Sequence, residues 1–232
     1  MLHPQYVDQY TRGTGGHKAK RELLLSGDEV LDTLALPLPV LPLTQIRAVA
    51  TRAANALSGG KALVEPNFLP HTTLDAARAA ADLCVKDQAP SSSVPLLSVI
   101  ATLEQLRKAL AESTGRGLTS TCELQAVAYS AGGSYQRHVD WKPGMPIGPH
   151  GSTSVKRSIS LLIYLTPDDW NPASDGGALR VYDGTPAHTH MDVQPLPGQL
   201  VLFDASQTAH EVLTTRRDRL LMAGWLHEEF KT

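Results

Sequence analysis

The chain has 232 residues, with 21 basic and 23 acidic side chains, a formal net charge of −2 and a hydrophobic fraction of 42%. This length and apolar content are enough for one domain with its own core. The lack of a basic excess argues against nucleic-acid binding, and no apolar run is long enough to cross a bilayer, so no membrane partner is expected.

The cysteines and the first residues bear on the compartment. Cys84 and Cys122 fit no metal-binding spacing. A single disulfide remains open, but a reducing cytoplasm is favoured, with the nucleus as the alternative. The first five residues lack the charged-then-apolar order of a secretory signal. We therefore expect a cytoplasmic protein.

Helical periodicity dominates between residues 44 and 115. Apolar side chains recur at helical spacing from the start of this region, and the alanine-rich stretch 74–85 predicts a second helix. Thr102 followed by Gln105 is a capping box that predicts the start of a third helix, and Gly115 predicts its end. These helices are expected to support a core formed by the second half of the chain.

From residue 118 onward the sequence changes to short strands separated by turns. The predicted strands are residues 124–129, 135–140, 158–165, 178–182, 190–194, 199–203 and 219–226. Helices followed by many strands favour an α+β fold in which helices pack on one sheet of a sandwich or barrel. Residues 1–34 are expected to form a mobile N-terminal segment, and 35–232 a single domain.

The candidate chemistry lies in His138, Asp140 and His210. Alternate residues of a strand leave the same face, so His138 and Asp140 can bind one ion if the fold supplies His210. Two imidazoles and one carboxylate are the set that binds non-haem Fe(II) and leaves open positions. Arg219 offers a positive charge for the far carboxylate of a 2-oxo acid. These four residues indicate an iron-dependent oxygenase.

Each of these residue types also has a purely structural interpretation. Tyr129, Tyr135 and Tyr164 are of a kind common in the cores of β-proteins, because strands favour aromatic residues. Arg219 follows two other arginines and an aspartate and could belong to a solvated edge. His227, near the end of the chain, is expected at the surface. The order and spacing of several motifs together are therefore needed to decide between the two interpretations.

Taken in order, those motifs resemble the hypoxia-inducible-factor prolyl hydroxylases and their microbial relatives among the 2-oxoglutarate/Fe(II) dioxygenases. The matching segments are residues 127–129, 135–140, 157–165, 169–170, 176–181, 196–203, 210–212 and 219–225. The resemblance implies a double-stranded β-helix, or jelly roll, of about eight strands over residues 118–228. It also implies Fe(II), 2-oxoglutarate and O2 as cofactors, with ascorbate as an optional reductant.

The resemblance also implies a role for each matching residue. The iron ligands would be His138, Asp140 and His210, with no further catalytic residue. Arg219 and Tyr164 would bind the distal carboxylate of 2-oxoglutarate. Leu162 and Leu179 would pack along its methylenes, and Tyr129 would line the pocket near the iron. The prolyl substrate would be bordered by Tyr135, Trp225 and Arg157. Arg157 and Tyr164 are an odd number of residues apart, so a regular strand would point them to opposite faces. The place of Arg157 in the cavity therefore requires an irregular start to the strand.

The implied reaction is hydroxylation of a prolyl residue in a protein or peptide, with release of succinate and CO2. The loop 141–156 is unusually long and is expected to be a lid or a substrate rim. Three alternatives stay open: a same-core dioxygenase acting on another residue or a free small molecule, a nucleic-acid demethylase, and a binding module without catalysis. The net charge disfavours the demethylase, and the complete ligand set with Arg219 disfavours the binding module.

Overall fold

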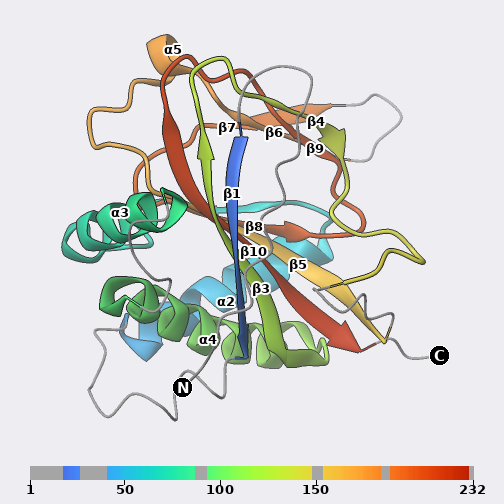
Figure 1. Cartoon of the computed structure of the whole chain (residues 1–232). Helices are drawn as coiled ribbons and strands as arrows, with labels where there is room; N and C mark the ends of the chain where they lie inside the picture. Colours follow the sequence, from blue (N-terminus) through green and yellow to red (C-terminus); the bar gives the residue numbers. More distant parts are fainter. Residues whose placement is uncertain (1–17, 27–40, 87–92, 148–153, 184–188, 230–232) are drawn as a thin grey trace.

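The structure is a computed structural model that describes residues 18–26, 41–86, 93–147, 154–183 and 189–229 (Figure 1). Its helices are α2 (Leu43–Ser58), α3 (His71–Val85), α4 (Val94–Thr114) and the short α5 (Pro172–Asp175). Its strands are β1 (Lys18–Ser26), β2 (Leu63–Glu65), β3 (Leu118–Tyr129), β4 (Tyr135–His138), β5 (Val155–Tyr164), β6 (Leu179–Tyr182), β7 (His190–Val193), β8 (Leu200–Asp204), β9 (His210–Val212) and β10 (Arg219–Glu229).

The strands form two antiparallel sheets. The larger sheet has the order β1-β3-β10-β5-β8-β2 and the smaller sheet the order β4-β9-β6-β7. Strands β3 to β10 supply the eight strands expected of the jelly roll. The expected α+β fold with a jelly-roll core is therefore confirmed. None of the described helices is long and apolar enough to span a membrane.

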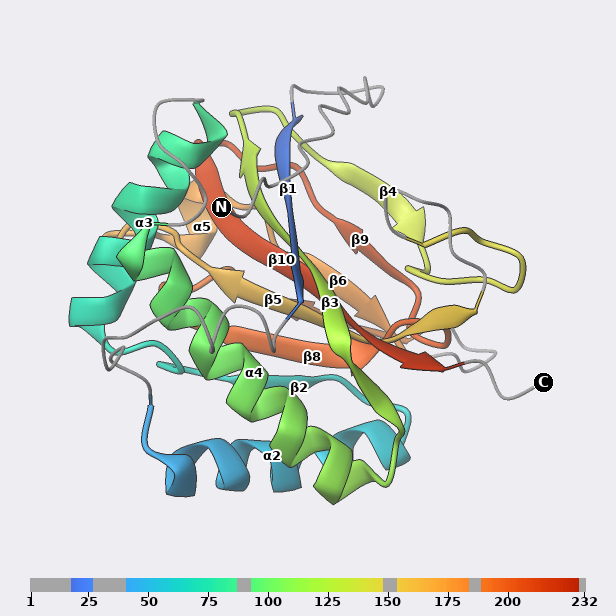
Figure 2. The same cartoon turned by 60° about the horizontal axis from the view of Figure 1, so that its bottom comes forward.

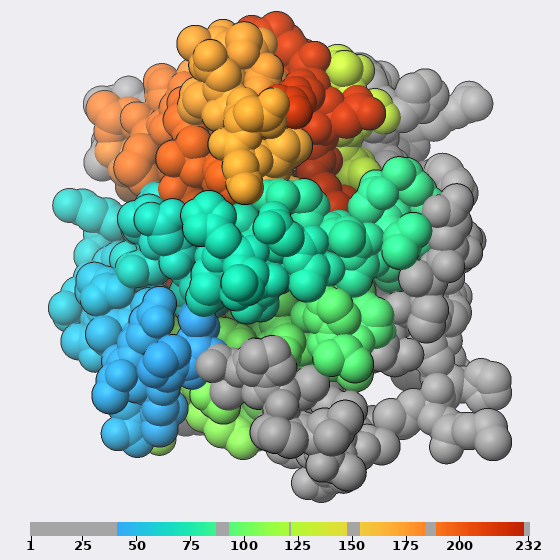
Figure 3. Space-filling model, turned by 90° about the vertical axis from the view of Figure 1, so that its left-hand side faces the viewer, coloured from blue at the N-terminus to red at the C-terminus, as the bar shows by residue number. Residues whose placement is uncertain are grey.

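The helices cover the outer face of the larger sheet, as expected (Figure 2). In α2 the buried stripe includes Ile46, Val49 and Ala53, which recur at helical spacing and enter the main core. Figure 3 shows α3 and the segment before it as a band across the side of the molecule, between α5 above and α2 and α4 below. The small side chains of α3, such as Ala77 and Ala81, are fully buried and let this helix pack closely.

Helix α4 begins earlier than the capping box predicts. It starts at Val94 with a proline in its first turn, a position that proline tolerates. Thr102 lies in the middle of the helix, where its hydroxyl donates to the Ser98 carbonyl at 2.9 Å. The capping-box prediction is wrong because apolar residues before Thr102, such as Leu96 and Val99, extend the buried face. The predicted end is confirmed, since Gly115 has a left-handed φ of 69°.

The N-terminal segment contains a strand that the sequence analysis does not predict. Strand β1 pairs antiparallel with β3, from Lys18 opposite Tyr129 to Ser26 opposite Thr121. This pairing uses the backbone groups that β3 would otherwise leave open at the sheet edge. Residues 18–26 thus form an edge strand of the larger sheet, and the mobility expected of the N-terminal segment stays a prediction. Residues 1–17 and 27–34 lie outside the described part of the chain, and the domain boundary at residue 35 stays a prediction.

Alternate residues of each long strand face either the helices or the space between the sheets. On β5, Ile159, Leu161 and Ile163 enter the core beneath the helices, whereas Ser160, Leu162 and Tyr164 line a cavity between the sheets. Burial on both faces explains why the strand is apolar without interruption from Leu161 to Ile163. The cavity between the sheets is where the candidate residues meet.

Candidate active site

Two neighbouring strands bring the candidate histidines together. His138, the last residue of β4, is the direct partner of His210, the first residue of β9. Asp140 follows β4, and its backbone N–H donates to the Ala205 carbonyl at 2.9 Å, which fixes it to the turn after β8. The candidate ligand atoms of the three side chains lie within 4.8 Å of one another. The predicted proximity of His138, Asp140 and His210 is therefore confirmed.

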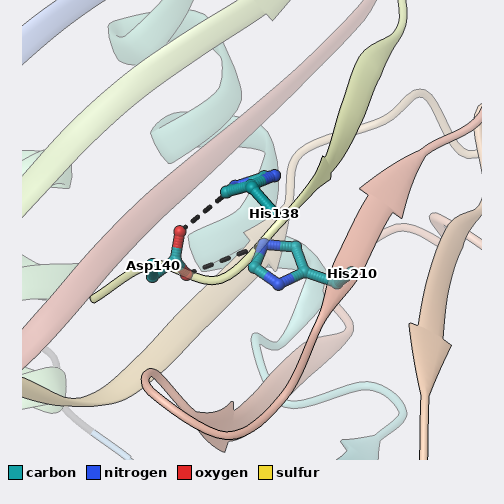
Figure 4. A group of neighbouring side chains, drawn as sticks. All are labelled: His138, Asp140 and His210. Atoms are coloured by element: carbon teal, nitrogen blue, oxygen red, sulfur yellow. Dashed lines mark ion pairs between the residues drawn. The ribbon is translucent and has the colours of Figure 1, made fainter. Parts of the chain in front are cut away.

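Both imidazoles present their Nε2 atoms to Asp140 (Figure 4). The distances are 3.3 Å from His138 Nε2 to Oδ1 and 3.7 Å from His210 Nε2 to Oδ2. The Nδ1 atoms lie 2.8 Å from the Gln136 carbonyl and 3.1 Å from the Thr208 carbonyl. A carbonyl only accepts, so each Nδ1 carries a proton, and each Nε2 is the atom that would bind a metal beside the carboxylate. This donor set fits Fe(II).

The Asp140 carboxylate is ionised and also accepts a hydrogen bond from a residue outside the triad. Burial alone would raise its pKa, but the adjacent His138 and His210 imidazoles and the hydrogen bond from Ser160 hold the pKa well below its ordinary value. The Ser160 hydroxyl donates to Oδ2 at 2.6 Å. Ser160 lies on the cavity face of β5, and sequence reasoning did not identify it as a partner of Asp140. The carboxylate is thereby aimed between the two imidazoles.

The triad opens into a cavity of about 300 Å³ between the two sheets. Along β10, Arg219 and Trp225 both line it, six residues apart and about 20 Å along an extended strand. Ser160 pairs with Trp225 across the larger sheet and contacts Asp140, so the triad lies toward the Trp225 end. The cavity therefore has an arginine end, a metal-ligand region and a tryptophan end.

At the arginine end a buried cation faces buried polar atoms. Arg219 is 3% exposed, and its Nη1 donates to the Gly177 carbonyl at 2.5 Å. Its guanidinium carbon lies 4.7 Å from the centre of the Tyr129 ring and 5.8 Å from that of Tyr164. Arg219 Nε and the Tyr164 hydroxyl are buried without a hydrogen-bond partner among the described residues. Such donors are costly unless a ligand satisfies them, and a carboxylate suits them.

Burial also keeps the two tyrosines at this end protonated. It raises the pKa of Tyr164 to about 12 and raises that of Tyr129 as well, although the Arg219 charge opposes both shifts. Leu162 and Leu179 line the walls between this end and the triad. The five residues expected to surround 2-oxoglutarate therefore line one cavity, whose polar end offers a guanidinium and two protonated hydroxyls that can donate to an anion.

At the other end the residues expected to border a substrate also line the cavity. The Tyr135 ring stands edge-on to His138, with centroids 4.6 Å apart. The Arg157 guanidinium lies over Trp225, 3.9 Å from the ring centre. Strand β5 has the required irregularity, because Leu226 pairs with Ile159 but His227 pairs with Arg157. The extra residue, Ser158, forms a bulge that turns Arg157 onto the cavity face.

Sequence reasoning missed several residues around this end. Gln125 and Met145 line the cavity, and Glu123 lies beside Trp225 on the neighbouring strand. His227 is 4% exposed, so the surface prediction is wrong. Its imidazole hydrogen-bonds with Glu123. His227 lies two residues after Trp225 on β10, so strand alternation could have indicated that both face the same side.

Part of the long loop after Asp140 contributes to the same end. Trp141 and Ile147 pack against Trp225 in a small apolar cluster, and Met145 reaches the cavity. Residues 148–153 lie outside the described part of the chain. The described part of the loop therefore forms a rim of the cavity.

Comparison with known proteins matches this site to a family. Residues 124–227 match the model of the 2OG-Fe(II) oxygenase superfamily. A hypoxia-inducible factor prolyl hydroxylase of Caenorhabditis elegans is 38% identical over 64 residues, which span 27% of this chain and only 9% of that relative.

Solved structures show the same fold. A prolyl-4-hydroxylase of Pseudomonas putida superimposes with a TM-score of 0.67 at 25% identity, covering 84% of this chain and 100% of that one. A Trichoplax adhaerens prolyl hydroxylase, solved with a peptide fragment of the hypoxia-inducible factor oxygen degradation domain, gives a TM-score of 0.65 at 16% identity, covering 80% and 92%.

Proposed function

Because residues 124–227 match the model of the 2OG-Fe(II) oxygenase superfamily, we propose that this protein hydroxylates prolyl residues of a protein or peptide, using O2 and 2-oxoglutarate and releasing succinate and CO2. The observation that carries the proposal is the pairing of His138 with His210 beside an ionised Asp140, in one cavity with the buried Arg219. The C. elegans and P. putida relatives are both prolyl hydroxylases.

Fe(II) and 2-oxoglutarate are the cofactors of this superfamily, and the triad fits the metal. His138 and His210 would bind Fe(II) through Nε2, and Asp140 through its carboxylate. When bound, Fe(II) and 2-oxoglutarate supply the oxidising power for inserting one oxygen atom of O2 into a C–H bond. The chain's own contribution is to fix the imidazole orientation through the Gln136 and Thr208 carbonyls.

The arginine end would bind the co-substrate. Arg219 and the protonated Tyr164 would donate to the distal carboxylate, whose planar oxygens suit the guanidinium. Leu162 and Leu179 would pack against the methylenes and exclude water. The Tyr129 ring would hold the guanidinium in place from the other side.

The tryptophan end would receive the prolyl segment. Tyr135 and Trp225 offer flat aromatic surfaces next to the triad, and Arg157 extends the wall formed by Trp225. A prolyl ring is apolar and compact, which suits packing against aromatic faces. A protein or peptide substrate is supported by the relatives, and action on another residue or a small molecule is the alternative that the experiment must separate.

The test is heavy-oxygen labelling. Purified protein is incubated with Fe(II), 2-oxoglutarate, heavy O2 and host lysate, and label is located by peptide mass spectrometry. His138→Ala is compared with His71→Ala, which removes a histidine that is 76% exposed. Label on proline that is lost only in His138→Ala supports the proposal. Label on another residue, or succinate without protein label, refutes prolyl hydroxylation and favours the alternative.

A further inference from the structure

Beyond Trp225 the cavity wall is backed by a buried ion cluster of Glu123, Arg157 and His227. Glu123 on β3 is the direct partner of Trp225 on β10, and His227 is the direct partner of Arg157 on β5. The Glu123 carboxylate accepts from His227 Nε2 at 3.0 Å and from Arg157 Nε at 3.2 Å. Its second oxygen makes a short contact with Arg157 Nη2. The guanidinium is thus gripped along one edge in fork geometry.

The cluster is charged yet almost free of solvent. Glu123 is 5% and His227 4% exposed. Burial alone would raise the pKa of Glu123, but the hydrogen bonds from His227 and Arg157 hold it below its ordinary value. An ionised carboxylate only accepts, so His227 Nε2 carries a proton. Glu123 therefore neutralises Arg157 at its buried edge, while the face of the guanidinium lies on Trp225.

Arg157 connects this cluster to the metal-ligand region. Its Nη1 donates to the Asp140 backbone carbonyl at 3.3 Å, and its guanidinium carbon lies 3.9 Å from the centre of the Trp225 ring. Only Arg157 and Trp225 of this group line the cavity; Glu123 and His227 lie behind them. A free arginine side chain has many rotamers, so something must select this one.

We infer that Glu123 and His227 are positioning residues that lock Arg157 flat against Trp225 and so shape the surface on which the substrate segment lies. The inference rests on the proposed function, because it assigns the tryptophan end to the substrate. A neutralised guanidinium stacked on an indole is a rigid and nearly uncharged wall. Such a wall suits an uncharged prolyl segment and holds it at a fixed distance from the triad.

The experiment replaces Glu123 by Gln, which keeps the shape and removes the charge, and measures hydroxylation of a proline peptide by the full chain. We expect the KM for the peptide to rise about tenfold or more, since small misplacements at a reacting centre have effects of this size or larger. Hydroxyproline formed per succinate should fall, because a misplaced substrate lets co-substrate turn over unproductively. The KM for 2-oxoglutarate should stay within about twofold, a separation that general damage to the fold would not produce.

A double-mutant comparison tests whether Glu123 acts through Arg157. In an Arg157→Ala background, Glu123→Gln should add no further change, since residues of one network are not additive. The matched control is Asp192→Asn, which removes the carboxylate of a comparable two-bond pair with Arg180 at 2.8 Å on the smaller sheet, outside the cavity. This control should leave unchanged both the KM for the peptide and the amount of hydroxyproline formed per succinate.

Two results would overturn the inference: unchanged peptide KM and coupling in Glu123→Gln, or an equal effect of that change with and without Arg157. If Glu123→Gln does not fold, His227→Asn carries the same comparison. If the natural chain hydroxylates no proline, the proposed function itself fails before any variant is compared. An active natural chain with an indifferent variant refutes only the positioning role.

Discussion

Ser160→Ala is expected to weaken metal binding while leaving the fold intact. The lost hydroxyl donates at 2.6 Å to Asp140 Oδ2, and both residues are buried. A hydrogen bond to a charged group contributes about 1.5–3 kcal/mol. If that stabilisation is lost mainly from the metal-bound state, it corresponds to roughly a 10- to 150-fold loss of affinity. Alanine is nearly isosteric with serine, so little change in packing accompanies the loss.

The assay is an anaerobic titration with Fe(II), repeated with Mn(II) to separate metal binding from turnover. The matched control is Ser206→Ala, whose hydroxyl donates at 2.8 Å to Asp204, a carboxylate outside the triad. We expect the control to bind metal like the natural chain. Metal affinity within twofold of the natural chain in Ser160→Ala would refute the idea that this hydroxyl aims the Asp140 carboxylate.

Three other predictions concern the triad, the arginine end and acid stability. His210→Ala is expected to abolish succinate formation with an unchanged circular dichroism spectrum, and retained turnover would contradict the iron assignment. Arg219→Lys should raise the KM for 2-oxoglutarate about tenfold or more, because one ammonium replaces a two-donor fork; an unchanged KM would remove Arg219 from that role. The pKa of Asp204 is lowered because hydrogen bonds from Ser206 and Arg116 outweigh burial. Its stabilisation is therefore present above about pH 4 and is lost as the pH falls through the folded pKa. The urea-unfolding difference between the natural chain and Asp204→Asn should shrink at acid pH, and a constant difference would contradict this.

The parts of the site that follow strand periodicity could be predicted from the sequence. A period of two places Arg219 and Trp225 on one face of β10, and Leu162 and Tyr164 on one face of β5. Both pairs line the cavity. The expected strand 135–140 ends at His138, and Asp140 is placed beside His138 by its backbone hydrogen bond to Ala205 rather than by strand periodicity. Where a residue's environment is set by its own strand, the pattern is therefore enough.

The parts that depend on pairing between distant segments could not be predicted. The partner of His138 in β9 is decided by the pairing of two strands of the smaller sheet that lie far apart in the sequence, so only the family resemblance suggested it. The Ser158 bulge has no sequence signal of its own, although it decides which way Arg157 points. His227 looks like a surface residue because its buried partner, Glu123, comes from a strand far away in the sequence.

The side chains that line the cavity are more exposed at one end than at the other, and this difference sets the order in which ligands bind and leave. At the arginine end Arg219 is 3% and Tyr164 1% exposed, whereas Met145, which also lines the cavity, is 39% exposed. A molecule bound at the arginine end must pass the triad first, and a peptide lying on Trp225 would block its path. The kinetics should then be ordered: 2-oxoglutarate binds before the peptide, and succinate leaves after the hydroxylated peptide. Added succinate would accordingly compete with 2-oxoglutarate but not with the peptide.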